Sequence, residues 1–234
     1  MSNIKKIIVW VGNGVGKQVR PTYEWKPDSS RTLIYYPLTS NLVDQMWNWN
    51  TGTMHWTCTY NSSTWIYVTG RSSNYVTWLS NGIANRNVFT LCVWFRYSSL
   101  SWSSNIDNIM WYANNSQTNQ AFDVRTYPNN TITAVVVGRI NATISNPRNS
   151  DWHNLVITAD WTTYKVYDKW VLIKSESNSN AVQNYSELQL WWWWNYTSWR
   201  SANGYIKDYI VENYAWSEEE ITNYYNSTKS TYWL

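Results

Sequence analysis

The sequence predicts an all-β fold: two antiparallel sheets packed as a sandwich or jelly roll, with one short helix near the C-terminus. Short apolar or alternating runs rich in Val, Ile, Tyr and Thr recur along the chain, separated by polar turns. Strands at this spacing are typical of β-sandwiches. One segment, SEEEITNYYNS at 217–227, reads as helix, because Ser217 and Glu220 form the capping-box pattern of a helix start.

The expected strands follow one another from residue 31 to the predicted helix. They are the runs at 32–38, 65–70, 87–98, 108–113, 121–127, 131–140, 152–160, 163–168, 171–177, 187–190 and 204–213. Residues 1–30 predict a separate N-terminal β-hairpin and linker: IKKIIVWV and GKQVRP flank the turn GNGV, and Pro21 and Pro27 mark the linker. The predicted domains are therefore 1–30 and a sandwich over 31–234.

Composition excludes several functional classes. Only 14% of the 234 residues are charged, the net charge is +3, and no basic run exceeds Lys5-Lys6, so we expect no nucleic-acid partner. No apolar run reaches the length of a membrane helix, so we expect no membrane insertion. The N-terminal apolar run is too short for a signal-peptide core. Cys92 is expected to be a buried small hydrophobe, and a Cys58–Cys92 disulfide stays open.

The abundance of tryptophan is the unusual feature, because 20 tryptophans outnumber eight glycines. Trp161 and Trp170 fall where the pattern predicts tight hairpin turns, which need a positive φ and ordinarily use glycine. UGA is read as tryptophan in one variant genetic code and as glycine in another. Our hypothesis is that many of these tryptophans stand for glycine in a lineage that reads UGA as glycine.

The reassigned positions are those where glycine restores an ordinary turn or loop. They are Trp47, Trp49, Trp56, Trp65, Trp102, Trp111, Trp161, Trp170, Trp191, Trp192, Trp193, Trp194 and Trp199. Trp25, Trp94, Trp152 and Trp216 stand in contexts that suit a true tryptophan. The alternative is that the indoles are literal and form sugar-stacking platforms. Four consecutive strand residues, however, point alternately to opposite faces and cannot make one platform.

With that correction, four stretches carry a family resemblance. LIYYPLTSNLVDQMWNWNTGT (33–53) has an Asp-x-x-Gly-Asn-Gly-like turn with Asp44 as its acid, and FTLCVWFRYS (89–98) has a Trp-Phe pair. The others are DWHNLVITAD (151–160) and GYIKDYIVENYAWSEEEITNYY (204–225). The chain resembles, over about 31–228, the laminin-G-like, concanavalin A-like lectin/glucanase superfamily. The resemblance implies a jelly roll of two antiparallel sheets. Residues 1–30 fall outside it and resemble short leader segments of phage structural and surface proteins.

No catalytic pattern emerges. Glucanases of that superfamily carry three acids on one strand, and nothing here matches: Glu176 stands alone, and Asp208 and Glu212 lack a third acid and are expected to be strand surface charge. His55 and His153 have no nucleophile motif around them, and WHNLV reads as the start of a strand. The resemblance implies Ca²⁺ as a cofactor, with Asp44 and Asp208 as the candidate metal residues.

The sequence therefore predicts a binding module without enzymatic activity. The expected partner is a glycan or a host-surface receptor, held by loops at one edge of the sandwich through Asn, Tyr and backbone groups. The expected location is a virion appendage such as a phage tail fibre, or the cell surface, without an evident signal peptide. A homo-oligomeric decoration or assembly protein that contacts other virion proteins is the alternative, and a glycoside hydrolase is the third reading.

Overall fold

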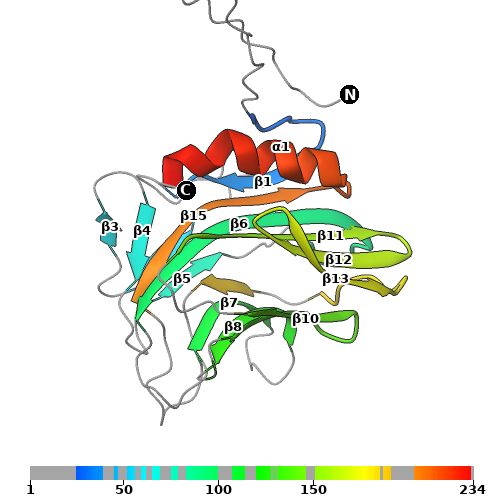
Figure 1. Cartoon of the computed structure of the whole chain (residues 1–234), viewed down its shortest axis with the longest axis horizontal. Coiled ribbons are helices and arrows are strands. Elements are labelled where there is room, and N and C mark those ends of the chain that lie inside the picture. The colour runs from blue at the N-terminus through cyan, green and yellow to red at the C-terminus, as the bar shows by residue number, and fades with distance from the viewer. Residues whose placement is uncertain are drawn as a thin grey trace, which may run out of the picture.

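The computed structural model is an antiparallel β-sandwich with one C-terminal helix, as the sequence predicts (Figure 1). It describes residues 25–38, 45–46, 52–55, 59–61, 65–68, 75–78, 83–99, 107–113, 120–127, 129, 131–145, 151–184, 187–190 and 203–232. Residues 1–24 of the predicted N-terminal hairpin and linker lie outside these ranges. Asp44 and the four tryptophans at 191–194 also lie outside them. Among the described residues, no helix combines the length and the apolar character needed to cross a membrane.

An eight-stranded sheet forms one layer, in the order β13-β12-β11-β6-β15-β4-β3, with β1 also paired to β15. Its strands are β1 (Thr32–Tyr36), β3 (Thr59–Asn61), β4 (Trp65–Val68), β6 (Val88–Ser99), β11 (His153–Asp160), β12 (Thr163–Asp168), β13 (Val171–Ser177) and β15 (Asn203–Glu212). β15 pairs with β6 along one side. On its other side it pairs with β4 through residues 204–206 and with β1 through residues 209–212.

A seven-stranded sheet forms the second layer, in the order β10-β9-β8-β7-β14-β5-β2. Its strands are β2 (Thr53–His55), β5 (Tyr75–Trp78), β7 (Asp107–Ala113), β8 (Gln120–Tyr127), β9 (Thr131–Val136), β10 (Ile140–Ser145) and β14 (Glu187–Leu190). The sequence predicted a single strand over 131–140, but the structure divides this run into β9 and the start of β10. Gly138, at a φ of 69°, turns the chain between them.

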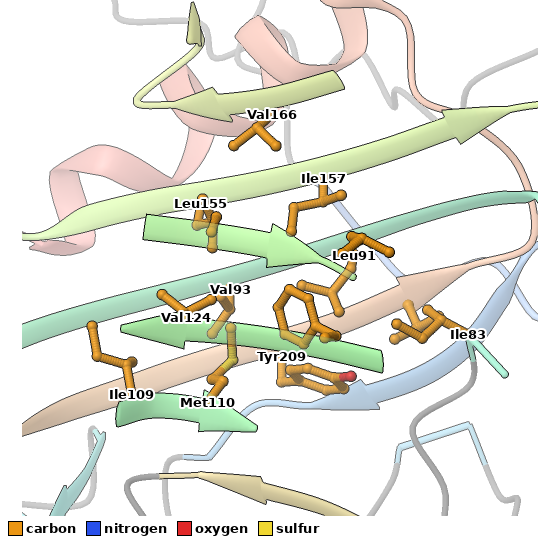
Figure 2. Close-up of a cluster of buried hydrophobic side chains, with 14 of the residues drawn as sticks. Ile83, Leu91, Val93, Ile109, Met110, Val124, Leu155, Ile157, Val166 and Tyr209 are labelled. Atoms are coloured by element: carbon orange, nitrogen blue, oxygen red, sulfur yellow. The ribbon is translucent and has the colours of Figure 1, made fainter. Parts of the chain in front are cut away.

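The core lies between the two sheets, where alternate side chains of each sheet face the other (Figure 2). Leu91, Val93 and Ile157 come from the eight-stranded sheet, and Met110 and Val124 come from the seven-stranded sheet; all are fully buried. Burying each such side chain contributes about 1.5–3 kcal/mol. This core fixes which residues of β6, β11 and β15 point outward, to the opposite face.

The helix α1 (Glu218–Thr228) lies on the outer side of the eight-stranded sheet, above β1 and β15 (Figure 1). It begins where the sequence predicts. Ser217 is its N-cap, and Ser217 and Glu220 form the predicted capping box. A short 3-10 helix, η1 (Lys229–Tyr232), follows it. The helix therefore covers a face that the sandwich core leaves uncovered.

Candidate functional site

The outer face of the eight-stranded sheet carries a second apolar cluster beneath α1. The sheet contributes Cys92, Trp94, Trp152, Val156, Tyr167 and Ile210, and the helical segment contributes Trp216, Ile221, Tyr224 and Tyr225. Trp94 stacks on Tyr225 with ring centroids 5.6 Å apart and 19° between the planes. Because this sheet is covered on both faces, β6 and β11 read as nearly continuous apolar runs. Cys92 is fully buried and free, as expected for a small hydrophobe.

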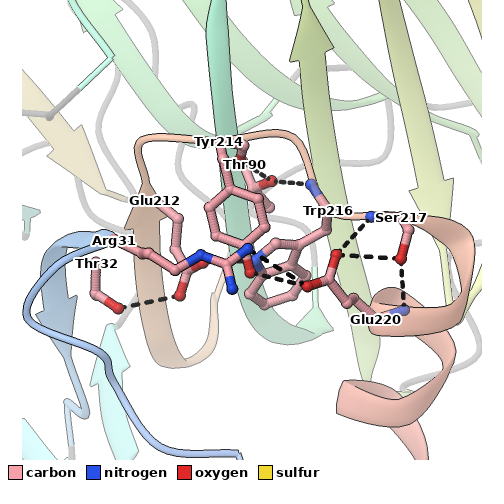
Figure 3. A network of polar contacts seen from close by, with 8 residues as sticks. All are labelled: Arg31, Thr32, Thr90, Glu212, Tyr214, Trp216, Ser217 and Glu220. Carbon is pink, nitrogen blue, oxygen red and sulfur yellow. Dashed lines mark hydrogen bonds and ion pairs between the residues drawn. The ribbon is translucent and has the colours of Figure 1, made fainter. Parts of the chain in front are cut away.

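A buried glutamate anchors the segment that leads into α1 (Figure 3). Glu212, at the end of β15, is 3% exposed. Its carboxylate accepts hydrogen bonds from Trp216 Nε1 at 2.7 Å and from the Thr32 hydroxyl at 3.0 Å. Thr90 also connects β6 to the segment before α1. Its hydroxyl donates a hydrogen bond to the Tyr214 carbonyl and accepts one from the Trp216 amide, both at 2.8 Å.

An arginine and a tyrosine extend this network over the start of the helix. The Arg31 guanidinium lies 3.3 Å from the centroid of the Tyr214 ring and 3.6 Å from a carboxylate oxygen of Glu220. The Tyr214 hydroxyl donates to the same carboxylate at 3.1 Å. Burial raises the pKa of Glu212, and hydrogen bonds from Trp216 and Thr32 oppose that rise. Each residue drawn in Figure 3 has a partner within this network, which anchors the start of the helix to the sheet.

A second polar feature lies further along the same outer face. Arg96 of β6 points to the side that Trp94 occupies, and its guanidinium carbon lies 4.7 Å from the Tyr205 ring centroid and 5.6 Å from that of Trp152. The two rings lie 6.4 Å apart. Trp152 is buried, whereas Arg96 and Tyr205 are partly exposed. We refer to Arg96, Trp152 and Tyr205 as the aromatic–arginine surface.

The register of the sheet explains why these three side chains meet. Tyr205 on β15 lies directly opposite Arg96 on β6. Trp152 precedes β11, whose first residue, His153, pairs with Phe95. Side chains opposite one another on antiparallel strands lie about 5 Å apart at Cβ, so the three side chains share one patch. Sequence reasoning missed this patch because its members are more than 50 positions apart in the chain and no local motif joins them.

Arg96 carries its charge without an acidic partner among the described residues. Its Nε is buried and has no hydrogen-bond partner there. Lys207, also on the outer face, is 9% exposed, and Lys229 lies 5.5 Å from the Tyr225 ring. Asp151, next to Trp152 in the sequence, lies 3.8 Å from the Lys169 ammonium. The patch therefore combines the charge of one arginine with two aromatic rings.

Two tryptophans occupy hairpin turns at opposite ends of β12. Asp168 pairs with Val171, so Lys169 and Trp170 are the two turn residues, with φ of 49° and 66°. Trp161, at a φ of 72°, lies in the turn between β11 and β12. Trp161 is 64% exposed and Trp170 is 45% exposed. The prediction that both positions are tight turns with positive φ is confirmed, and the strain there is real for any residue with a Cβ.

The predicted metal residues do not come together in the described part of the chain. Asp208 lies in a bulge of β15 at a φ of 50° and is 8% exposed. Its carboxylate accepts a hydrogen bond from the Tyr35 hydroxyl at 3.2 Å. Burial, and after it the charge of Asp208, raises the pKa of Tyr35. Among the described residues, no three His, Cys, Asp or Glu side chains form a metal-binding group. Ca²⁺ takes six to eight oxygens, so these residues alone do not fit it; the calcium prediction rests on Asp44.

The expectation that Asp208 and Glu212 are surface charges on a strand is wrong. Both are buried, because the bulge turns Asp208 toward β1 and the Trp216 segment covers Glu212. Each acid serves as a hydrogen-bond acceptor within the fold. Glu176 on the exposed strand β13 forms an ion pair with Lys174 at 3.0 Å. No two of these three acids form the close carboxylate pair that retaining glycoside hydrolysis needs, since each has a separate structural partner.

The structure adds a histidine–aspartate pair that the sequence did not reveal. His153 Nδ1 lies 3.0 Å from Asp168 Oδ2, and the imidazole stacks on Phe95. The two side chains are 4% and 10% exposed. His153 starts β11, as predicted, and its Nε2 has no hydrogen-bond partner among the described residues. The pair joins the start of β11 to the end of β12.

Known protein structures share this architecture. No protein-family model and no curated protein sequence matches the chain. Solved structures do match. Botulinum neurotoxin type C, which depends for entering cells on interaction with two ganglioside molecules, superposes with a TM-score of 0.70 at 14% identity, over 85% of this chain and 51% of that one. The two share a β-sandwich fold.

Two further structures agree. The binding domain of botulinum neurotoxin serotype D gives a TM-score of 0.68 at 14% identity and covers 85% of this chain and 52% of that one. The binding domain of Paraclostridial Mosquitocidal Protein 1 gives 0.69 at 14% identity with the same coverage. The chain therefore spans about half the length of the structures it matches. At these identities the likeness establishes the fold.

Proposed function

We propose that this chain is a non-catalytic module that binds carbohydrate on a cell surface. The aromatic–arginine surface carries the proposal. A partly exposed tyrosine ring beside a guanidinium offers an apolar face for a sugar ring and donors for its oxygens. The lectin-like fold, found in the receptor-binding domains of neurotoxins, supports this function. The structural use of Asp208, Glu212 and the His153–Asp168 pair supports the absence of catalysis.

The direct test is binding of the purified chain to a glycan array, with Tyr205→Ala as the test variant. We expect binding to a subset of glycans and a loss of about tenfold in affinity on removal of the ring, since one aromatic contact contributes about 1 kcal/mol or more. Tyr205→Phe, which keeps the ring, should bind like the parent chain. Turnover of any glycan on the array would contradict the non-catalytic assignment.

The setting that we propose is a phage tail fibre or other virion appendage, or a bacterial surface. It rests on the resemblance of residues 1–30 to leader segments of phage structural and surface proteins. The neighbouring genes test it, because tail or capsid genes alongside would support a virion. A homo-oligomer that enters particles but binds no glycan would favour the alternative, a decoration or assembly protein.

The glycine hypothesis is part of the same proposal. The positive φ and the exposure of Trp161 and Trp170 support it, since glycine adopts such turns without strain. The packed rings of Trp94, Trp152 and Trp216 support their status as true tryptophans. The codons decide between the readings: UGA at 161, 170 and 191–194 agrees with glycine, and UGG there would end the hypothesis. The aromatic–arginine surface contains none of the reassigned positions.

A further inference from the structure

We propose that the aromatic–arginine surface selects an acidic sugar, one that carries a carboxylate or a sulfate group. This inference rests on the proposed carbohydrate binding and adds the chemical class of the ligand. Its basis is the position of Arg96, which the fold holds among rings and away from every described carboxylate.

The arginine is held in place before any ligand binds. Its guanidinium lies 4.7 Å from the Tyr205 centroid and 5.6 Å from the Trp152 centroid. Trp152 is 2% exposed and belongs to the apolar cluster under α1, so this ring is fixed by packing. A guanidinium fixed against rings loses little rotamer entropy when it forms hydrogen bonds.

The charge of this arginine is uncompensated within the described residues. Other arginines there have partners: Arg31 contacts Glu220, Arg125 pairs with Asp123, and Arg139 donates to the Ala181 carbonyl. Among the described residues, Arg96 forms no ion pair and no hydrogen bond, and its buried Nε lacks an acceptor. A buried donor left without an acceptor costs about 1–3 kcal/mol. An incoming oxyanion would meet the partly exposed remainder of the guanidinium and compensate its charge.

The geometry of the donor fits an oxyanion better than a neutral hydroxyl. Guanidinium presents a planar fork of N–H donors that matches carboxylate and comparable oxyanions in two parallel hydrogen bonds. Tyr205, partly exposed next to the arginine, provides the face on which the ring of the same sugar can lie. An acidic sugar uses both groups, whereas a neutral sugar uses only the ring.

The test uses the full chain and immobilised oligosaccharides in matched sets. Each set holds a glycan ending in glucuronic acid or N-acetylneuraminic acid, its methyl ester, a sulfated analogue and the neutral parent. We expect the charged members to bind about tenfold or more tightly than the ester and the neutral parent. Added salt should narrow that difference, because the arginine is partly exposed. Comparing the affinities of the carboxylated and the sulfated members shows which of the two acidic groups the chain prefers.

The variants assign this preference to one residue. Arg96→Gln should abolish the preference for charged members and leave weak binding of the neutral parent. Arg96→Lys should retain part of it, because the charge remains and the fork is lost. Lys174→Gln, which removes one positive charge on exposed strand β13, is the matched control and should bind like the parent chain. Thermal unfolding of each variant shows whether it is folded.

The possible outcomes distinguish a failure of the acidic-sugar inference from a failure of the proposed carbohydrate binding. Equal binding of charged and neutral members by the parent chain would overturn the acidic-sugar inference and leave carbohydrate binding in place. A full charge preference in a folded Arg96→Gln variant would do the same. Failure of every glycan to bind would remove the proposed function itself.

Discussion

Tryptophans occupy two different environments in this molecule, the outer face under α1 and the turns of the β11–β12–β13 hairpins. Trp94 and Trp216 on the outer face are 0% and 4% exposed and contact Tyr225 and Tyr224. Trp161 and Trp170 in the turns are 64% and 45% exposed. The outer-face rings form part of an apolar cluster, whereas the turn rings stand on backbone that glycine would adopt without strain.

The difference shows that one residue type can be indispensable at one position and interchangeable at another. Trp216 both fills space against Tyr224 and donates to buried Glu212. Trp161 lies in a polar turn, in which the Asp160 carboxylate accepts hydrogen bonds from the backbone amides of Thr162 and Thr163. That turn is specified by Asp160 and by backbone geometry. Substitutions at the two kinds of position should therefore have opposite consequences.

The largest effect is expected for Trp216→Ala. Removing this ring leaves a cavity under α1 and takes a donor from Glu212, so the free energy of unfolding should fall by about 3–5 kcal/mol. Trp216→Phe keeps most of the apolar contact and loses only the indole N–H, and should cost about 1–3 kcal/mol. Urea unfolding measures both. Equal losses in the two variants would show that the hydrogen bond, and not the packing, holds the helix.

A pH dependence is expected from Glu212 in the outer-face region. Burial raises the folded-state pKa of Glu212 above its ordinary value of 4.5, so the protonated carboxyl is favoured by folding. Its contribution to stability is complete below that value and is lost as the pH rises through the folded pKa. The neighbouring ionisable groups are Arg31, Tyr214 and, through Arg31, Glu220.

Glu212→Gln isolates this dependence. The parent chain should lose stability relative to the variant as the pH rises from about 4.5, because glutamine cannot ionise. Unfolding free energies of both chains across that range measure the effect. Glu176→Gln, on exposed β13, is the matched control and should follow the parent. A constant difference between the parent and Glu212→Gln would refute the assigned role of Glu212.

The smallest effects are expected in the turns. Trp161→Gly should leave stability unchanged or raise it by about 1 kcal/mol, since it removes the strain of a positive φ. Trp161→Ala, which keeps a Cβ, is the control and should gain less. Trp170→Gly should be closer to neutral, because Trp170 also contacts Tyr225 at 4.4 Å between centroids. Thermal unfolding measures all three variants. A fall in the free energy of unfolding of more than about 2 kcal/mol for Trp161→Gly would contradict the difference between turn and outer-face tryptophans.

Local sequence signals predicted local structure well. The turns at 161 and 169–170 follow from polar residues between alternating runs, and the helix start follows from Ser217 and Glu220. Three strands, β2, β3 and β5, were missed. They are three or four residues long and lie in stretches rich in Asn, Ser and Thr, so an alternating pattern is too short to identify them. β5 also pairs with β14, more than 100 positions away in the chain.

By itself, the sequence determined the fold class, the order of most strands and the cap of the helix, because these depend on periodicity and on contacts within a few residues. The tertiary structure alone decided that Asp208 and Glu212 are buried acceptors and that Arg96 meets Tyr205 and Trp152. Those outcomes depend on strand register, on a bulge in β15 and on the packing of α1. Such features join residues far apart in the chain, and no local pattern encodes them.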